Sequence, residues 1–416
     1  MATARPIPDQ PNDMLLKNMD AHSPIKLLVL PSWYPPRGGR FFREHGLAMA
    51  DAGIKVDVVA LNAAGLKSIF SPGRQTPGTE DEPAGFCEYV KRHLVLPGHD
   101  MAKVRRWTND LVSFARDRIR ATEKPDLIQV HSSMWAGLAA MEIHRTMDIP
   151  YVITEHRGRF ISGHPHTGNM LLPWQKPLLK EIFEGAVKVV TVSQALQEKI
   201  VSLAPASKDR ITTIPNMVDT GFFVPADQPP PGPFTFFCLA HLEADKGIDT
   251  LVGATKILSE RLARPFNVVI GGGGQQGRRL KSMARKLSLE NTISFTGPLN
   301  REAVRHHLQK SHAFVMPSRF EAFGVVYIEA MACGLPVIAT KAGGPADFTG
   351  EETGLLVDPG QADVLASAMH EMMQRSAEYR PDRIRESVTR RFSKEVVVAS
   401  YLELYHQILE KTRKHA

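Results

Sequence analysis

The strongest constraint on how this chain can fold is a regular alternation of short apolar segments with segments of helical spacing, interrupted once. Apolar, β-rich runs such as residues 26–31 and 127–132 are separated by helix-like stretches. This pattern is typical of parallel strands that helices bury on both faces. Between residues 224 and 233 five of the ten residues are proline, which excludes a helix or a central strand there. The alternation restarts at residue 234, so we predict two α/β units joined by a stiff linker.

The expected strands form one set before the linker and one set after it. They comprise residues 26–31, 56–61, 127–132, 151–156, 187–193, 211–216, 234–241, 266–271, 293–297, 313–318, 336–340 and 354–358. Residues 62–100 show no clear pattern. The predicted divisions are a mobile leader (1–23), an N-terminal domain (24–223), the linker (224–233), a C-terminal domain (234–390) and a C-terminal helix (391–416). Open parallel sheets bind ligands at the carboxyl ends of their strands, so we expect the two domains to face each other across a cleft.

Composition narrows the class of protein. Hydrophobic residues make up 43% of the 416 residues, and no apolar run approaches the roughly 18 residues of a membrane-spanning helix. The three cysteines, Cys87, Cys238 and Cys333, lie far apart. Their spacing excludes a disulfide framework and indicates a reducing compartment, so we expect a cytoplasmic protein. The net charge of +7 favours anionic partners, but we expect no nucleic-acid partner because no nucleic-acid-binding motif is present.

The most informative segment is PSRFEAFGVVYIEAMACGLPVIAT, residues 317–340. Glu321 lies in the predicted loop before a helix that Gly324 begins, and Glu329 lies inside that helix. The free N–H groups and the positive dipole end at a helix start bind anions, and Gly324 lets a phosphate approach the backbone closely. Two carboxylates beside an anion site suit a sugar joined to a nucleoside diphosphate. The alternative interpretation is two surface glutamates, with Glu321 as a helix-start charge.

This segment resembles the E-x7-E signature of retaining glycosyltransferases of family 4. Other segments resemble the family's motifs in the expected order: LPSWYPPRGGRFFREHGLAMADAGIKVDVV, TEHRGRF, VTVSQAL, IPNMVDTGFFVP, LAHLEADKGIDTLVGA and AGGPADFTGEETGLLVDPG. The resemblance implies the GT-B fold, an α/β fold in which two Rossmann-like domains face each other and a C-terminal helix packs back on the first. It also implies transfer of a hexose-type sugar from a nucleoside-diphosphate donor, UDP- or GDP-linked, to a hydroxyl of a glycan, lipid-linked glycan or lipid. The anomeric configuration would be retained.

The resemblance further implies roles for individual residues. Glu329 would hold the donor ribose, Glu321 would contact the transferred sugar, and Lys246 would place a positive charge on the diphosphate. His156 would lie beside the reacting sugar. The remaining donor-side positions that the resemblance implies are Gly38, Gly39, Phe323, Gly324, Val325, Gly343 and Gly344.

One position departs from the family's usual pattern. An arginine often stands five residues before the lysine, whereas this chain has His241 there. Arginine offers a fixed charge and a two-pronged donor that histidine lacks. We therefore consider Arg157 and Arg319 as substitutes, and we expect a neutral His241 to donate one hydrogen bond.

We predict that the enzyme needs no metal and no cofactor. The sequence contains no D-x-D pair, which is the usual sign of a metal-dependent transferase, and Lys246 with a helix start could take the cation's place. His164 and His166 are expected to be loop residues rather than metal ligands. His131 ends an expected strand and has a structural interpretation, as does Asp219 together with Asn216 in the turn before the linker.

Other functional classes remain as alternatives. Gly272, Gly274 and Gly277 form a G-x-G-x-x-G pattern after a predicted strand, but the next strand ends at Thr296-Gly297 without the acidic residue that a dinucleotide site needs. A phosphorylase or nucleotide-sugar epimerase of the same fold, and a non-catalytic nucleotide-sugar-binding protein, are the other two.

A basic segment suggests a second kind of contact. Residues 101–120 carry six lysines or arginines with Trp107, Leu111 and Phe114 between them. On a helix, such a segment can rest on an anionic membrane with its apolar side down. We therefore expect peripheral association with the inner face of a membrane, and the alternative is a solvated charged face over a core stripe.

Overall fold

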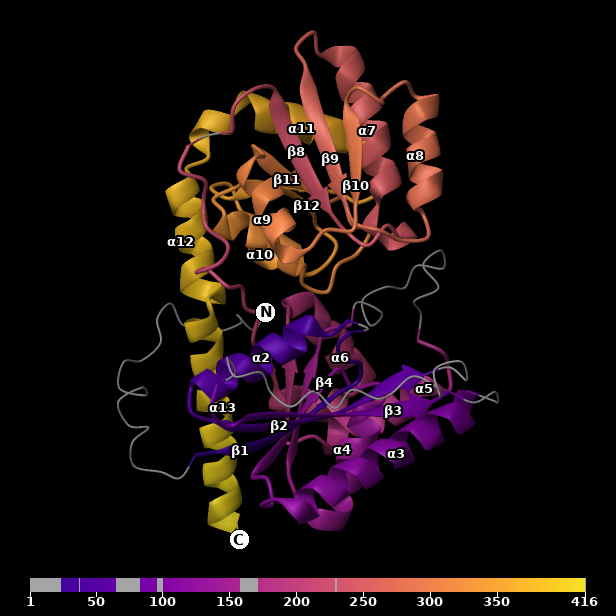
Figure 1. The fold of residues 1–416 in the computed structure, drawn as a ribbon, viewed down its shortest axis with the longest axis vertical. Helices are drawn as coiled ribbons and strands as arrows, with labels where there is room; N and C mark the ends of the chain where they lie inside the picture. Colours follow the sequence, from indigo (N-terminus) through magenta and orange to yellow (C-terminus); the bar gives the residue numbers. More distant parts are fainter. Residues whose placement is uncertain are drawn as a thin grey trace.

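The computed structural model describes residues 24–36, 38–64, 83–95, 100–157, 171–228 and 230–415. The predicted leader and the two loop histidines at 164 and 166 lie outside the described residues. The described chain forms two parallel-sheet units, drawn one above the other in Figure 1. This is the predicted α/β GT-B architecture.

The first unit contains a seven-stranded parallel sheet with the order β3-β2-β1-β4-β5-β6-β7. Its strands are β1 (Lys26–Pro31), β2 (Lys55–Ala64), β3 (Phe86–Leu94), β4 (Leu127–His131), β5 (Tyr151–Glu155), β6 (Lys188–Thr191) and β7 (Ile211–Thr213). Its helices are α2 (Arg40–Asp51), α3 (Asp100–Ala121), α4 (Ala136–Met147), α5 (Gln175–Gly185) and α6 (Gln194–Leu203), with the 3-10 turn η5 (Pro205–Arg210). Strand β3 was not predicted because it is a half-exposed edge strand that lacks a continuous apolar run.

The second unit contains a six-stranded parallel sheet with the order β10-β9-β8-β11-β12-β13. Its strands are β8 (Phe234–Leu239), β9 (Phe266–Gly271), β10 (Ile293–Gly297), β11 (Ala313–Val315), β12 (Val337–Thr340) and β13 (Gly354–Val357). Its helices are α7 (Ile248–Arg261), α8 (Gly277–Lys286), α9 (Arg301–Gln309), α10 (Val325–Ala332) and α11 (Ala362–Gln374), with the 3-10 turns η6 (Ala244–Lys246), η7 (Gly344–Asp347) and η8 (Ser376–Glu378).

Strand β11 is shorter than the predicted strand 313–318, because it ends at Val315. Pro317 has no N–H group with which to continue the ladder. The chain instead leaves the sheet here, and residues 316–324 form the loop that leads to α10. The early end of β11 therefore places Glu321 beyond the sheet edge rather than on a strand.

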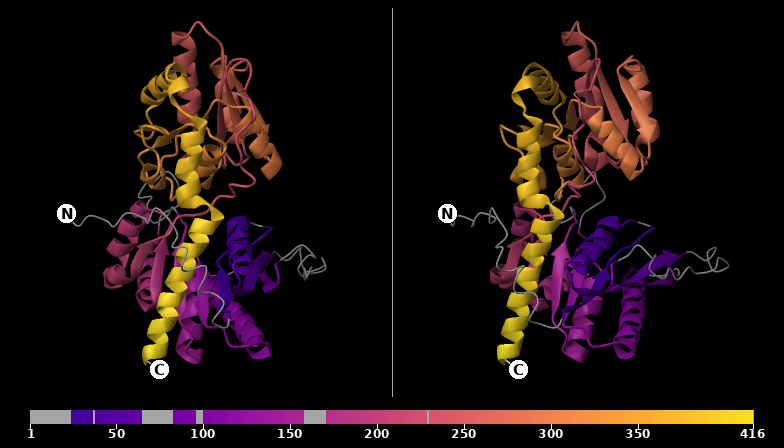
Figure 2. Two further views of the ribbon diagram at one scale, coloured as in Figure 1. Left: turned by 90° about the vertical axis from the view of Figure 1, so that its left-hand side faces the viewer. Right: turned by 60° about the vertical axis from the view of Figure 1, so that its left-hand side comes forward.

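Two helices close the chain and connect the units. Helix α12 (Pro381–Phe392) packs on the second unit, and α13 (Lys394–His415) then runs along the first unit, as Figures 1 and 2 show. Tyr401 and Tyr405 of α13 are buried, and their hydroxyl groups bond Thr154 Oγ1 at 3.0 Å and Gln129 Oε1 at 2.8 Å. The C-terminal helix is thus part of the first unit's core.

Helix α3 does not present an apolar side to a membrane. Its residues Leu111 and Ala115 are fully buried against the sheet, and Trp107 and Phe114 pack against the same core. The expectation that the apolar side of residues 101–120 rests on a membrane is therefore wrong, because that side is already covered. Among the described residues, no helix has both the length and the apolar character to cross a bilayer.

Candidate active site

The second unit holds a buried ion pair at the carboxyl ends of its strands. Lys246, in η6, places Nζ 2.6 Å from Oε2 of Glu321, and the two side chains are 20% and 14% exposed. Burial alone would lower the pKa of Lys246, but the charge of Glu321 and its hydrogen bond outweigh this effect and raise it. Lys246 is therefore a permanent cation at neutral pH.

Arg319 fixes the loop that carries this lysine. Its backbone N–H donates to the carbonyl of Asp245 at 2.7 Å, and its guanidinium donates to the Ala244 carbonyl and to Asp249 Oδ2, the latter at 2.8 Å. Arg319 stands two residues before Glu321, so these bonds hold both members of the Lys246–Glu321 pair at one place. A guanidinium with these partners serves the loop rather than the position that His241 occupies.

The Gly343-Gly344 turn lies directly against the Glu321 loop. The Glu321 N–H donates to the Ala342 carbonyl at 2.8 Å, and the Gly344 N–H donates to the Glu321 carbonyl at 2.9 Å. Gly343 has φ +112°, and a Cβ atom there would lie 2.0 Å from the Glu321 carbonyl oxygen. Only glycine allows this approach, which explains the pair of glycines at this turn.

Helix α10 begins at this point. Gly324 caps it with φ +86°, and a Cβ atom on Gly324 would lie 3.1 Å from Cγ of Glu321. The helix start, with the N–H of Val325, is therefore adjacent to the Lys246–Glu321 pair. The Phe323 side chain is 3% exposed and packs on Phe348 and Phe392, so only the backbone of this residue can meet a ligand.

Glu329 lies on the next turns of α10 and faces the first unit. Burial raises its pKa to about 8. Its carboxylate has no hydrogen-bond partner that the described part of the chain supplies. A narrow cavity joins it to the first unit and is lined by Glu329, Val325, Arg301, His131, His156 and Asn216, among others.

In the first unit, a fully buried carboxylate organises the strand ends. Glu155 accepts hydrogen bonds from the N–H and the hydroxyl of Ser133, at 2.9 and 2.5 Å, and from the N–H groups of His156 and Arg157, both at 2.9 Å. This carboxylate ties the loop after β4 to the loop after β5 and places His156 at the cavity. Burial lowers the pKa of His156 to about 3, so the ring is neutral at pH 7.

The N-terminal glycine loop sits on the same side of the first unit. Gly39 caps α2 with φ +75°, and a Cβ atom there would lie 2.6 Å from the carbonyl oxygen of Trp33. Gly38 also has positive φ and lies over the Trp33 ring. Arg157, the other possible substitute for the usual arginine, stacks on that ring at 4.3 Å. His241 is exposed after β8.

The sequence did not identify three residues that complete this arrangement. Arg301, at the start of α9, binds Asp219 at 3.1 Å and lines the cavity beside Glu329. Asp347, from the second unit, accepts the N–H of Gln194 at 2.9 Å at the start of α6 in the first unit. Glu155 is the third. The only sequence signal for Asp347 and Glu155 is their place beside the glycine pair and beside His156.

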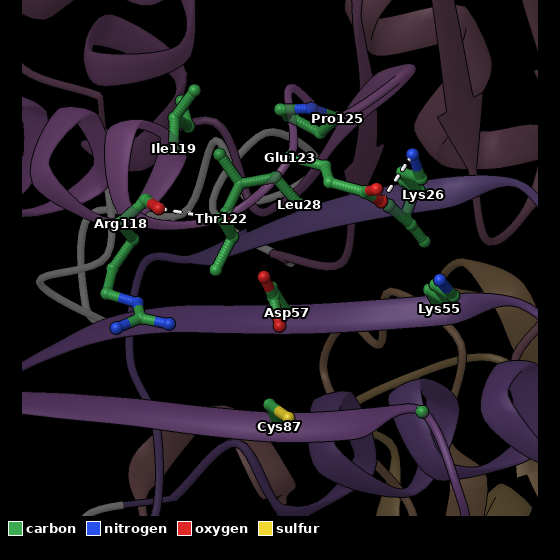
Figure 3. Close-up of a pocket in the computed structure, with 12 residues that line it drawn as sticks. Lys26, Leu28, Lys55, Asp57, Cys87, Arg118, Ile119, Thr122, Glu123 and Pro125 are labelled. Carbon is green, nitrogen blue, oxygen red and sulfur yellow. Dashed lines mark hydrogen bonds and ion pairs between the residues drawn. The ribbon is translucent and has the colours of Figure 1, made fainter.

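A second hollow lies at the opposite end of the first sheet and is separate from this site. Lys26 and Lys55 begin β1 and β2, so the hollow that they line with Asp57 and Arg118 is at the amino ends of the strands (Figure 3). Lys26 is already paired with Glu123 at 2.5 Å. Ligands of open parallel sheets bind at the carboxyl ends, and the cleft side is therefore the candidate active site.

Comparison with known families agrees with this geometry. Residues 38–222 match the model described as Glycosyltransferase Family 4, and residues 223–390 match the model described as Glycosyl transferases group 1. Among solved structures, sucrose-phosphate synthase from Thermosynechococcus elongatus is similar over 93% of this chain and 100% of its own, with a TM-score of 0.74 and 22% identity. HepE from Anabaena in complex with UDP and glucose covers 92% of this chain and 100% of its own, with a TM-score of 0.69 and 18% identity.

Two curated relatives are similar over most of their length. The D-inositol 3-phosphate glycosyltransferase of Arthrobacter sp. (strain FB24) is 30% identical over 77% of this chain and 78% of its own. The GDP-mannose-dependent alpha-(1-6)-phosphatidylinositol monomannoside mannosyltransferase of Mycobacterium tuberculosis (strain CDC 1551 / Oshkosh) is 30% identical over 84% of this chain and 89% of its own. These similarities confirm the resemblance that the E-x7-E segment suggested, and the chain is a glycosyltransferase that belongs to family 4.

Proposed function

We propose that this glycosyltransferase moves a hexose-type sugar from a nucleoside-diphosphate donor to a hydroxyl acceptor and retains the anomeric configuration. The observation that carries the proposal is the Lys246–Glu321 pair beside the start of α10. A cation and a helix start at one point suit a diphosphate, and a carboxylate between them suits the sugar attached to it.

In this proposal the donor extends along α10. The diphosphate contacts Lys246 and the backbone N–H groups at Gly324 and Val325, while the sugar lies against Glu321. The ribose reaches Glu329, whose free carboxylate accepts its hydroxyl hydrogens. On the other side of the cavity, His156 faces the sugar.

The chemistry is that of a leaving group with a growing negative charge. The bond between the anomeric carbon and the diphosphate breaks, and the charge on the departing oxygen is stabilised by Lys246 and the helix start. The acceptor oxygen bonds to the anomeric carbon from the same face, and its proton passes to the departing phosphate. The transition state is oxocarbenium-like, as in glycoside hydrolysis.

No metal or cofactor enters this proposal, because Lys246 already supplies a fixed charge where the diphosphate would lie. We expect transfer to continue in EDTA at an unchanged rate. A loss of activity in EDTA that added Mg²⁺ or Mn²⁺ restores would refute this part of the proposal.

The donor is proposed to be a UDP- or GDP-sugar. The structure of HepE contains UDP and glucose, and the mycobacterial relative is named as GDP-mannose-dependent. The acceptor is proposed to be a hydroxyl of a glycan, a lipid-linked glycan or a lipid. Both curated relatives named above act, by their names, on inositol-containing acceptors.

Two measurements test the proposal together. A panel of nucleotide sugars is screened for thermal stabilisation, since a ligand stabilises only the folded state that binds it. The sugar that stabilises the protein is then supplied in labelled form with candidate acceptors, beside the Glu321→Gln variant. Transfer by the wild type that falls more than tenfold in Glu321→Gln supports the proposal. Stabilisation without transfer for every acceptor class would instead favour a binding protein.

Association with an anionic membrane is proposed through charge alone, since the apolar side of α3 is buried. Arg105 and Arg120 are exposed on that helix and could contact lipid head groups. Sedimentation with anionic vesicles at low salt tests this part. Failure to sediment, or equal sedimentation of an Arg105→Gln/Arg120→Gln variant, would refute it.

A further inference from the structure

Two histidines from neighbouring strands meet at the cavity that the two units share. His131 ends β4 and His156 follows β5, and the register of these strands pairs His131 with Thr154. Nδ1 of His131 lies 3.2 Å from Nε2 of His156, within hydrogen-bonding distance. Glu155 fixes both loops, as described above, so this contact belongs to a rigid part of the site.

His131 has no access to water. It is 1% exposed and stacks on Phe42 with the ring centroids 4.7 Å apart. Its second nitrogen, Nε2, is buried and has no hydrogen-bond partner among the described residues. Burial also holds the pKa of His131 well below its usual value, so the two rings meet as neutral imidazoles at pH 7.

These facts decide where the protons lie. A neutral imidazole carries one N–H and one bare nitrogen. If His131 carried its proton on Nε2, a buried N–H would have no acceptor, and orphaned buried N–H groups are rare. The proton is therefore on Nδ1 of His131, which donates to Nε2 of His156. Because Nε2 of His156 accepts this bond, the proton of His156 must be on Nδ1.

We propose that His131 is a positioning residue that holds His156 in the tautomer with its proton on Nδ1. His156 then offers a hydrogen-bond donor to the donor sugar or its diphosphate, and it has no free lone pair with which to act as a base. This inference rests on the proposed glycosyl transfer and deepens it. It agrees with a mechanism in which the departing phosphate, and no side chain, takes the acceptor's proton.

The tautomers can be measured without any activity assay. Long-range ¹H–¹⁵N correlation spectra of protein with ¹⁵N-labelled histidine distinguish Nδ1–H from Nε2–H rings. The His156→Asn and His131→Asn variants assign the two signals. We expect both rings to be neutral and protonated on Nδ1 at pH 7. A His156 ring protonated on Nε2, or charged, would overturn the proposal, even if the protein transfers no sugar.

Matched substitutions then test the consequence for the reaction. The amide nitrogen of asparagine can replace a donor at Nδ1, whereas leucine cannot donate. We expect His131→Asn to retain transfer within about threefold of the wild type, and His131→Leu to lose more than tenfold in kcat with little change in the donor KM. We also expect His156→Asn to be at least tenfold more active than His156→Leu.

Two results would contradict the positioning role. One is equal loss of kcat in His131→Asn and His131→Leu while both variants melt like the wild type. The other is equal inactivity of His156→Asn and His156→Leu in folded protein, which would indicate a base. If His131→Leu does not fold, the spectra of the wild type still decide the proposal. An inactive wild type that shows the expected tautomers would count against glycosyl transfer and not against the tautomer assignment.

Discussion

The Lys246–Glu321 pair allows the structural and the catalytic contributions of one lysine to be separated. Exposed ion pairs contribute about 0–1 kcal/mol, whereas removal of one partner from a buried pair costs about 3–5 kcal/mol. With side chains 20% and 14% exposed, this pair lies between those limits. We therefore expect Lys246→Met to lower the free energy of unfolding by about 2 kcal/mol, since Glu321 would remain half-buried without its cation.

Removal of both charges should restore most of this stability. In the variant Lys246→Met/Glu321→Gln no charged group is left without its partner, so we expect its free energy of unfolding to lie within about 1 kcal/mol of the wild type. Activity should behave differently. If Lys246 stabilises the departing diphosphate, each single variant and the double variant should transfer sugar more than tenfold more slowly, a barrier increase of at least about 1.4 kcal/mol.

The assay pairs urea unfolding with initial transfer rates at saturating donor. Lys256→Met is a matched control, because Lys256 also forms an ion pair, with Glu260 at 3.1 Å, but on the exposed face of α7. It should change the unfolding free energy by less than about 0.5 kcal/mol and leave the rate unaltered. A double variant that regains both stability and the wild-type rate would refute the catalytic role and leave Lys246 with a structural one.

Three further predictions follow from the contacts around the site. Burial raises the pKa of Glu329 to about 8, so the folded state holds a proton that the unfolded state has lost, and stability should fall as pH rises from about 5 to about 8; Glu329→Gln should flatten the thermal midpoint over this range, and parallel curves would contradict the assignment. Gly343→Ala, which places Cβ 2.0 Å from the Glu321 carbonyl, should cost about 2 kcal/mol or more and over tenfold in rate, whereas Gly350→Ala, with open space around it, should change neither. Asp347→Ala removes the cap on α6 and should cost about 1 kcal/mol in unfolding experiments and raise the donor KM; an unchanged KM would show that this contact does not help to close the units.

The sequence predicted the fold where burial leaves a continuous apolar pattern. Strands such as β4 and β5 are wholly buried, and their runs of apolar residues identify them without any knowledge of their neighbours. Strand β3 could not be found in this way because one edge of the sheet is open to water and its residues alternate only weakly. The same limit explains the error at α3, whose mixed surface fits a membrane or a core equally well until the covering sheet is known.

The candidate site was predictable only where chemistry is written locally. Glu321, Gly324 and Glu329 share one segment, and their spacing along a loop and a helix already indicates an anion site. Arg301 and Asp347 contribute through contacts between units, and no local pattern marks them. His131 and His156 are 25 residues apart, and whether their nitrogens meet depends on the register of β4 and β5, which no apolar run encodes.

The ion pair in the ligand-free site also explains how the donor could bind without leaving a charge exposed. Lys246 is neutralised by Glu321 before binding, and an arriving diphosphate can replace one anion with another at the same ammonium group. Glu321 is then freed to accept hydrogen bonds from the sugar hydroxyls, which are the groups that move with the anomeric carbon. Because Arg319 and the Gly343-Gly344 turn hold both loops in place, the exchange needs only side-chain motion. The site is thus organised before the donor arrives, which is the condition under which fixed charges stabilise a transition state most strongly.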